Sequence, residues 1–312
     1  MKILVTGVTG QVGRELVRSL QPLGEVIALD SRSLDLGNPA ALGLRLREIA
    51  PAVVVNPAAY TAVDKAESEI DRARLINARA PAALAQYCAE ASALLVHYST
   101  DYVFDGSREG RYREDDPVAP VNAYGLTKLE GEQAIQASGC AHLILRTSWV
   151  YSLTGNNFLR TMVRLASTRD HLRIVADQFG VPTPASLIAD TTAQLIARRQ
   201  VDPQRRDWSG ILNLAPSGRT SWFDYASLGL SLLHRASQAG AQPGAQSDAA
   251  QAMPRSHWQV PRMPTLEAIA ASDYPTPARR PANSCLDLSR IESWGLRMPA
   301  WDQLLAAVLR DA

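Results

Sequence analysis

The first half of the chain alternates short runs of β-branched residues with stretches of helical character. The runs lie at Ile3 to Thr6, Val26 to Leu29 and Val53 to Val55, and the segment from Asn38 to Ile49 begins with an Asn-Pro pair typical of a helix start. Val53-Val-Val55 is apolar without alternation, which is typical of a strand buried on both faces of a parallel sheet. This order of strands and helices predicts an α/β fold with a doubly wound parallel sheet.

The pattern continues to about residue 150 and then changes. Further strands are expected at Leu94 to Tyr98 and Leu143 to Arg146, with one helix from about Asp64 to Ala80, and later segments are polar and rich in proline. We therefore expect a Rossmann-like dinucleotide-binding domain over residues 1–150, to which the chain returns around 185–215, and a smaller α/β substrate-binding lobe mainly over 151–312. The run from about Ala236 to Gln251, rich in Ala, Gln, Gly and Ser, is expected to be a surface loop or a short alanine-rich helix.

Composition narrows the class of ligand. The 312 residues carry 32 Lys and Arg against 31 Asp and Glu, a net charge of +1, so we expect small molecules rather than nucleic acid or a membrane surface as ligands. No 18 apolar residues run together, and the first residues enter a strand directly, which predicts neither a membrane span nor export. The three cysteines are widely spaced and form no C-x-x-C, which fits a reducing cytoplasm.

A glycine-rich turn follows the first expected strand. Gly7, Gly10 and Gly13 are spaced G-x-x-G-x-x-G at the start of a helix, where backbone can approach a pyrophosphate closely and helix N–H groups face its charge. Asp30 ends the second strand, where an acidic residue often holds an adenosine ribose. The alternatives are a glycine turn without a ligand and an Asp30 that only caps a turn.

Tyr124 and Lys128 are the most informative pair for chemistry. Only three residues of the chain are lysines, so its nine tyrosines would meet a lysine four residues later roughly 0.09 times by chance. Residues at i and i+4 share one face of a helix, and a nearby cation lowers the pKa of a phenol, so the pair predicts a proton donor and acceptor. Ser99 and Thr100 follow the strand before it and could bind a substrate oxygen, although such a turn more often caps local backbone. The five histidines show no metal-ligand spacing, and no metal site is predicted.

Four longer stretches carry a more specific resemblance. Residues 53–67, 97–104, 146–151 and 274–281, together with the glycine turn and Tyr-x-x-x-Lys, resemble the dTDP-4-dehydrorhamnose reductases, a family of extended short-chain dehydrogenases/reductases. The resemblance runs nearly end to end. It implies reduction of the C4 ketone of dTDP-4-dehydro-β-L-rhamnose to dTDP-L-rhamnose, with NADPH or NADH as the hydride donor, for a cell-surface polysaccharide.

The resemblance also implies roles for individual residues. Thr100, Tyr124 and Lys128 would be the catalytic set: Tyr124 protonates the developing alkoxide, Thr100 steadies that oxygen, and Lys128 lowers the tyrosine pKa and holds the nicotinamide ribose. Asp101 and Trp149 would contact the sugar nucleotide, and the paired charges of Arg279 and Arg280 make them candidates for its diphosphate. With the glycines of the turn, the residues expected at the cofactor are Gly7, Gly10, Gln11, Val12, Gly13, Asp30, Asp35, Leu36, Ala59, Tyr60, Thr61, Tyr98 and Lys128.

Two properties differ among members of this family. Some form magnesium-linked dimers through carboxylates, one of which matches Glu15, but Ser186 stands where another carboxylate is expected, so we do not predict Mg²⁺; a homodimer is an option that the resemblance allows. Asp30 favours an unphosphorylated ribose, whereas Arg32 could accept the 2′-phosphate of NADPH.

Other functions remain open to a chain with these residues. A related dehydratase would carry Thr-Asp-Glu, but Tyr102 follows Asp101 here, so a base for the C5 proton is missing. Another nucleotide-sugar 4-ketoreductase, or a 4-epimerase, needs little beyond Tyr124, Lys128 and the nicotinamide. Similar chains also act as non-catalytic regulatory subunits of methionine adenosyltransferase, a role that an intact catalytic set disfavours.

Overall fold

A six-stranded parallel sheet forms the centre of the larger part of the chain. The computed structural model describes residues 1–202, 209–240 and 258–312. The strands run in the order β10-β5-β4-β3-β1-β2, so the order reverses beside β1. This confirms the doubly wound fold class and puts the topological switch point between β1 and β3. The strands are β1 (Lys2–Val5), β2 (Glu25–Ala28), β3 (Val53–Asn56), β4 (Leu94–Thr100), β5 (Ala141–Thr147) and β10 (Gly210–Asn213).

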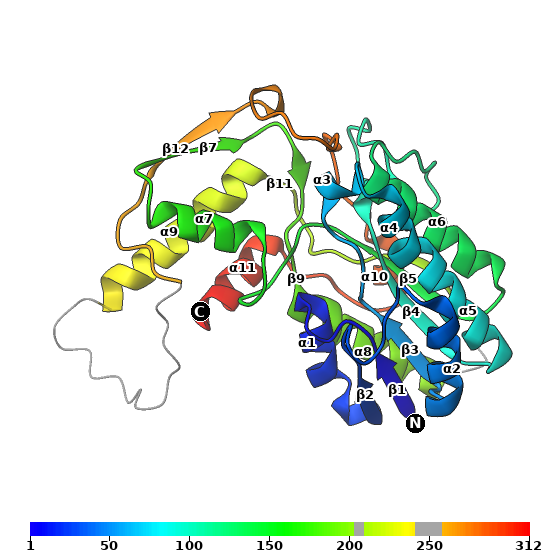
Figure 1. The fold of residues 1–312 in the computed structure, drawn as a ribbon. Coiled ribbons are helices and arrows are strands. Elements are labelled where there is room, and N and C mark those ends of the chain that lie inside the picture. Colours follow the sequence, from blue (N-terminus) through cyan, green and yellow to red (C-terminus); the bar gives the residue numbers. More distant parts are fainter. Residues whose placement is uncertain (203–208, 241–257) are drawn as a thin grey trace.

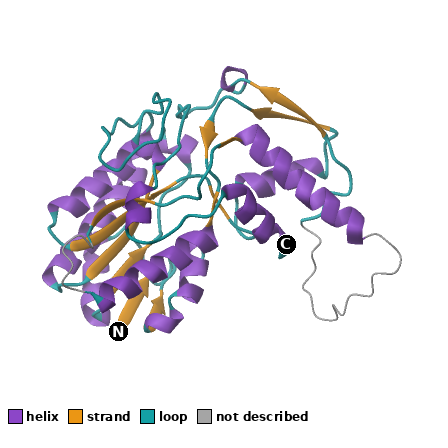
Figure 2. Cartoon of the chain, turned by 180° about the vertical axis from the view of Figure 1, so that it is seen from behind, coloured by secondary structure: helices purple, strands orange, loops and turns teal. Residues whose placement is uncertain are grey.

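Helices cover both faces of this sheet (Figures 1 and 2). On one face pack α1 (Gln11–Ser19) and α8 (Ala185–Val201), and on the other pack α2 (Pro39–Ile49), α5 (Ala80–Glu90) and α6 (Ala123–Ala137). Side chains alternate between the faces: Ile3 and Val5 join the core under α1 and α8, whereas Leu4 joins the core under α2 and α5. Both faces of β1 and β3 are therefore buried, as their unbroken apolar sequences predict.

The helix expected from Asp64 to Ala80 is broken into three pieces. They are α3 (Val63–Ala66), α4 (Ile70–Arg74) and a π-helical turn over Leu75–Arg79, labelled η2. Asn77 in that turn is fully buried; its side-chain oxygen accepts from the Tyr60 N–H at 2.8 Å and its Nδ2 donates to the Tyr60 carbonyl at 3.1 Å. The widened turn thus ties α4 to the loop after β3, a tertiary contact that local propensity does not encode.

A smaller second lobe lies beside the sheet (Figure 1). Its aromatic-rich core contains Tyr151, Leu159, Tyr225 and Leu305. Within the described residues, three two-stranded sheets lie outside the central sheet; two of them are parallel and one is antiparallel. The elements after residue 147 outside the sheet are β6 (Val150–Tyr151), α7 (Phe158–Ala166), β7 (His171–Val175), β8 (Phe179–Gly180), β9 (Thr183–Pro184), β11 (Thr220–Ser221), α9 (Trp222–Gly240), β12 (Thr265–Ile269), α10 (Ser289–Ser293) and α11 (Trp301–Arg310).

The Ala-rich run from residue 236 to 251 begins within the last turns of α9. Because α9 extends to Gly240, residues 236–240 are helical rather than part of a loop, and residues 241–257 lie outside the described residues. None of the helices described in the structure is long and apolar enough to span a membrane.

Candidate active site

A cavity of about 720 Å³ opens at the carboxyl ends of the central strands. Its walls come from the segments after β1, β3, β4 and β5, with Trp222 added from the second lobe, so it lies over the switch point where doubly wound sheets bind ligands. Of the residues expected in the site, the cavity is lined by Gly7, Gly10, Gln11, Val12, Gly13, Ala59, Thr61, Tyr98, Thr100, Asp101, Tyr124, Lys128 and Trp149.

The glycine turn forms one end of the cavity. Gly7 has a φ of +56°, and a Cβ on it would lie 2.8 Å from the Ala58 Cβ, so a side chain there would collide with the loop after β3. A Cβ on Gly13 would lie 2.3 Å from the Gly7 carbonyl oxygen. Gly10 precedes α1 and provides no side-chain cap, which leaves the first N–H groups of the helix available to an anion. This backbone cradle fits the pyrophosphate of a dinucleotide.

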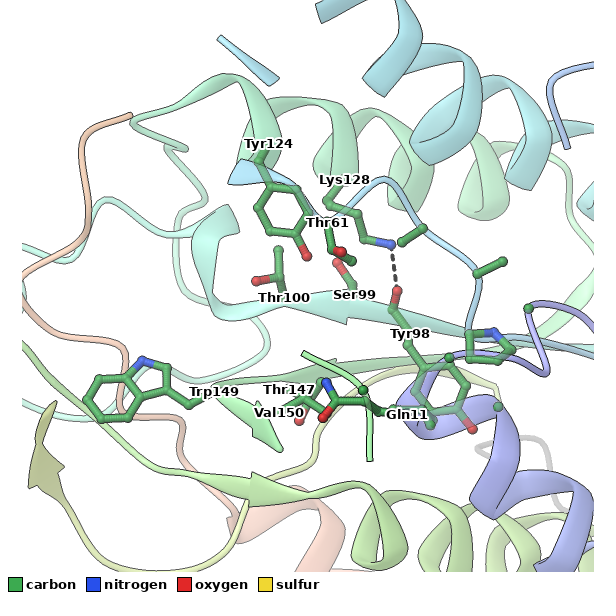
Figure 3. Close-up of a pocket in the computed structure, with 18 of the residues that line it drawn as sticks. Gln11, Thr61, Tyr98, Ser99, Thr100, Tyr124, Lys128, Thr147, Trp149 and Val150 are labelled. Carbon is green, nitrogen blue, oxygen red and sulfur yellow. Dashed lines mark hydrogen bonds between the residues drawn. The ribbon is translucent and has the colours of Figure 1, made fainter. Parts of the chain in front are cut away.

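Tyr124 and Thr100 meet at the other end of the cavity. Tyr124 is in the first turn of α6, whose N-cap Asn122 accepts from the Gly125 N–H at 2.8 Å, and its hydroxyl points toward Thr100 at the end of β4 (Figure 3). Burial raises the pKa of the phenol, the Asp101 carboxylate raises it further, and the hydrogen bond with Thr100 opposes both. This corrects the expectation of a lowered pKa: the phenol is held protonated, which is the state a proton donor needs.

Lys128 is held by hydrogen bonds with residues of β4. Its Nζ lies 2.6 Å from the Tyr98 carbonyl oxygen, to which it donates (Figure 3), and 3.1 Å from His97 Nε2. Burial lowers the pKa of the lysine to about 8, and Glu132 acts in the opposite direction. The ammonium is thus anchored to β4, one helical turn beyond Tyr124, at a distance suited to a ligand lying beside both residues.

Asp101 is a second titratable group in the cavity wall. It is 3% exposed, and Thr100 Oγ1 donates to its Oδ1 at 2.8 Å. Burial raises the pKa of this carboxyl to about 6, although hydrogen bonds from Ser284 and Thr100 lower it. Near pH 7 a ligand therefore meets a carboxylate that is only weakly solvated, and a hydroxyl of a sugar is a suitable donor for it.

Trp149 extends the cavity toward the second lobe. Its ring stacks on Trp222 at the start of α9, with centroids 3.5 Å apart and planes inclined by 10°. Gly180 of β8 lies under the ring: a Cβ there would be 2.5 Å from Trp149 Cε2, so only glycine leaves room for the stack. Trp149 itself has a φ of +45°, a backbone conformation rarely adopted by bulky residues. The aromatic pair offers a flat surface to a ring of a ligand.

Three residues expected at the adenosine lie outside the main cavity. The Asp30 Oδ1 accepts from the N–H groups of Arg32 and Ser33 at 3.1 and 2.9 Å and from Ser33 Oγ at 2.7 Å, so it closes the turn after β2. Asp35 lines a separate cavity of about 280 Å³ beside α2, and Leu36 is buried in the core under α2.

Tyr60, Arg279 and Arg280 also lie away from the described cavity walls. The Tyr60 hydroxyl donates to Glu69 at 2.8 Å. Arg279 is exposed, and its carbonyl accepts from Asn122 Nδ2. Arg280 forms a bidentate ion pair with Asp64, at 2.6 and 2.8 Å, and so fastens the segment around 276–281 to α3.

Several lining residues were not foreseen from the sequence. Thr147 ends β5 and is paired in register with Thr100 of β4, so its place at the same sheet edge could have been inferred from strand order. The Thr147 hydroxyl is buried, as is that of Ser99, for which the sequence had already suggested a bond to a substrate oxygen; within the described part of the chain neither has a hydrogen-bond partner, which leaves both for a ligand. Trp222 carries no local signal, because only the tertiary fold brings it to Trp149.

No group of three His, Cys, Asp or Glu residues that could hold a metal ion occurs in the described ranges. Glu15, the residue matched to a metal ligand, pairs with Arg18 at 3.2 Å, and Arg18 also pairs with Asp190 at 3.0 Å. Arg18 and Asp190 are exposed and Glu15 is half-buried, and the Arg18 guanidinium already provides a cation for both carboxylates.

Comparison with known proteins extends these observations to the family. Residues 1–312 match the family model described as the RmlD substrate binding domain. The chain is 44% identical over 317 residues to a dTDP-4-dehydrorhamnose reductase of Escherichia coli strain K12, across 100% of this chain and 98% of that protein. Among solved structures, a dTDP-4-dehydrorhamnose reductase of Clostridium acetobutylicum ATCC 824 is 34% identical with a TM-score of 0.84, across 99% of each chain.

A further similar structure is a complex with a nicotinamide cofactor. The dTDP-4-dehydrorhamnose reductase of Bacillus anthracis strain Ames, in complex with NADP, is 30% identical with a TM-score of 0.83, across 100% of this chain and 99% of that one. These similarities confirm the resemblance carried by the four sequence stretches. The chain belongs to the RmlD substrate binding domain family, together with the dTDP-4-dehydrorhamnose reductases.

Proposed function

We propose that this chain reduces the C4 ketone of dTDP-4-dehydro-β-L-rhamnose to dTDP-L-rhamnose. The observation that carries the proposal is the meeting of the Tyr124 phenol and the Thr100 hydroxyl in the cavity that the glycine turn also lines. A family member 44% identical over its full length bears the name of this activity.

Side chains of the protein transfer the proton in this reaction. When bound, the reduced nicotinamide supplies the hydride that C4 gains. Tyr124 transfers its phenolic proton to the ketone oxygen as negative charge develops there, and the Thr100 hydroxyl holds that oxygen in place. The phenolate left on Tyr124 lies one helical turn from the Lys128 ammonium, which stabilises it until a proton returns from solvent.

The cofactor is held by the backbone of the glycine turn and by the strand ends. Gly10, Gln11 and Val12 bind the pyrophosphate through the N-terminus of α1, and Lys128 holds the nicotinamide ribose. Asp30, Asp35, Leu36 and Tyr60 are assigned to the adenosine side of the cofactor.

NADPH is the preferred form in this proposal, with NADH accepted more weakly. Asp30 is engaged in its turn, and the exposed Arg32 next to it is free to meet a 2′-phosphate. Replacing Arg32 with Ala should raise the KM for NADPH and leave that for NADH unchanged; an equal effect on both would contradict this choice.

The second lobe, mainly residues 151–312, binds the sugar nucleotide. The stacked rings of Trp149 and Trp222 contact a ring of the substrate, and Asp101 accepts a hydrogen bond from a sugar hydroxyl. For the diphosphate, Arg279 is a better candidate than Arg280, because Arg280 already forms an ion pair with Asp64. The dinucleotide-binding domain covers residues 1–150 and the return of the chain at 185–215.

We also propose where the protein acts and in which state. It acts in the cytoplasm and supplies dTDP-L-rhamnose for a polysaccharide. It needs no bound Mg²⁺ and is a monomer or a homodimer. Sedimentation with and without magnesium distinguishes these states: a dimer that forms only with the ion would contradict the metal-free arrangement.

The decisive assay follows the loss of absorbance of the reduced nicotinamide with dTDP-4-dehydro-β-L-rhamnose prepared in situ. The proposal predicts turnover by the wild type. A folded, cofactor-binding protein without turnover would discard this substrate and favour a 4-epimerase, in which cofactor stays bound and unchanged, or a non-catalytic subunit of the methionine adenosyltransferase type.

A further inference from the structure

Four buried polar side chains form a row that leads from the residue before the glycine turn to Lys128 in the cavity wall. Thr6 Oγ1 donates to Asn56 Oδ1 at 2.6 Å, Asn56 Nδ2 lies 3.1 Å from His97 Nδ1, and His97 Nε2 lies 3.1 Å from Lys128 Nζ. Each of the four side chains is at most 1% exposed. The row starts just before the glycine turn, crosses the end of β3 at Asn56 and the middle of β4 at His97, and reaches α6 at Lys128.

The position of the Asn56 and His97 pair in the sheet is unusual. The two residues are direct cross-strand partners, and the rungs before them are Val53 with Leu94, Val54 with Leu95 and Val55 with Val96. An apolar pair at the last rung would continue this core without the cost of burying two polar side chains. His97 is not among the described residues that line the cavity, and the proton transfer proposed above does not use it.

Which groups of the row donate and which accept depends on whether Lys128 is charged. Burial, and then the charge of Lys128, hold the pKa of His97 well below 6.5, so the ring is neutral and has one N–H and one acceptor nitrogen. With the Asn56 amide as oriented, its Nδ2 donates to His97 Nδ1, so the ring proton is on His97 Nε2. Lys128 Nζ can accept a hydrogen bond from that N–H only when the lysine is a neutral amine. Turning the amide over exchanges its oxygen and nitrogen, moves the ring proton to Nδ1, and lets Nε2 accept from the ammonium.

We propose that His97 and Asn56 are positioning residues, which hold Lys128 Nζ at the cavity and couple its protonation to the orientation of this buried row. The inference rests on the proposed function, because Lys128 matters as a cation only if the cavity holds the cofactor ribose and the reacting tyrosine. The row ends at Thr6, next to Gly7, so the same side chains also join Lys128 to the turn that takes the pyrophosphate.

Other charges near the row set the direction of the effect. Glu132 of α6 favours the ammonium, and its two oxygens are held by Arg146 at 3.0 and 2.7 Å. Tyr124 faces the same space from α6, and Asp101, after β4, acts on Tyr124. None of these groups replaces the acceptor that Nε2 provides, so removing the imidazole should disfavour the ammonium.

The first test compares three variants of the full-length protein. His97→Leu removes the acceptor, whereas His97→Gln keeps an amide oxygen near the place of Nε2. Tyr87→Phe is the control, because it deletes a buried hydroxyl bond to the Pro51 carbonyl on the far side of the sheet. We expect His97→Leu to lower kcat/KM for the cofactor about tenfold to a hundredfold and to move the alkaline limb of its pH profile to lower pH. His97→Gln should recover most of both, and Tyr87→Phe should match the wild type.

A folded His97→Leu protein with the wild-type pH profile would overturn the proposal. Equal losses of kcat/KM in His97→Leu and His97→Gln, with an unchanged pH profile, would also overturn it, because that result would mean that His97 has a purely structural role.

The second test needs no turnover and no unstable variant. In wild-type protein with ¹⁵N-labelled histidine rings and NADP⁺ added, the His97 signals are those that His97→Gln removes. The proposal predicts a neutral ring throughout, with the proton on Nδ1 while Lys128 is charged and on Nε2 once the pH rises above about 8, where Lys128 loses its proton. A tautomer that does not change over this range would refute the coupling. If the wild type does not reduce the sugar nucleotide, the proposed function fails, whereas this spectrum still decides the inference.

Discussion

Replacing Gly13 with Ala tests the role of the glycine turn. A Cβ at this position would lie 2.3 Å from the Gly7 carbonyl oxygen and 2.8 Å from Val8 Cα. Both atoms are backbone, so no rotamer change can relieve the contact, and the start of α1 must move by about 1 Å to restore a normal separation. Overpacking of this kind costs about 1–3 kcal/mol. If the strain is relieved by displacing the helix N-terminus, cofactor binding should weaken roughly tenfold to a hundredfold.

Fluorescence titration with NADPH, together with thermal unfolding, measures the two parts of this cost. The matched control is Gly43→Ala in the middle of α2, where the nearest atom to a new Cβ is the flexible Arg47 Nη1 at 3.5 Å. That variant should bind NADPH normally and gain about 0.5–1 kcal/mol of stability from helix propensity. Wild-type NADPH affinity in Gly13→Ala would refute the assignment of this turn to the pyrophosphate.

The other predictions concern Asp101, the aromatic stack and metal. The pKa of Asp101 is about 6 in the folded protein against a usual 3.8, so the free energy of unfolding of the wild type should fall as the pH rises from about 4 to 6. Chemical denaturation between about pH 4 and 7 should therefore show Asp101→Asn gaining about 3 kcal/mol relative to wild type over this range. Parallel curves of unfolding free energy against pH for the two proteins would contradict the burial of this carboxyl. Gly180→Ala should raise the KM for the sugar nucleotide more than that for NADPH, because the new methyl displaces Trp149 from Trp222; equal KM changes would exclude the stack as a substrate surface. Treatment with EDTA should leave the turnover rate unchanged, and a loss restored by Mg²⁺ would show that the enzyme needs the ion.

The sheet and the position of the site could be predicted from the sequence because their signals are local. The run Val53-Val-Val55 became β3, extended by one residue to Asn56, and the strand expected at Leu94 to Tyr98 became Leu94–Thr100. Buried parallel strands need unbroken apolar residues, and glycine turns need their glycines, whatever the rest of the chain does. Parallel strands also bring their carboxyl ends to one edge, which places Thr100 near the glycine turn without further information.

The rest depends on contacts between distant segments. The break between α3 and α4 follows from the buried amide of Asn77, and the stack of Trp149 on Trp222 follows from how the second lobe folds back. The pKa of Tyr124 was predicted with the wrong sign, because residue spacing locates Lys128 but does not reveal that the phenol is buried beside Asp101 and that the lysine Nζ donates to the Tyr98 carbonyl. Side-chain pairing across the fold is set by packing, which local patterns do not encode.

In the proposed reaction, Tyr124 gives its proton to the ketone oxygen of a dTDP-4-dehydro sugar. The most direct measurement compares turnover of the wild type and Tyr124→Phe with NADPH and dTDP-4-dehydro-β-L-rhamnose, after NADPH titration shows that both bind the cofactor equally. We expect rapid oxidation of NADPH by the wild type and a loss of about a hundredfold to ten-thousandfold in kcat for the variant. A Tyr124→Phe protein that reduces the sugar at the wild-type rate would contradict it.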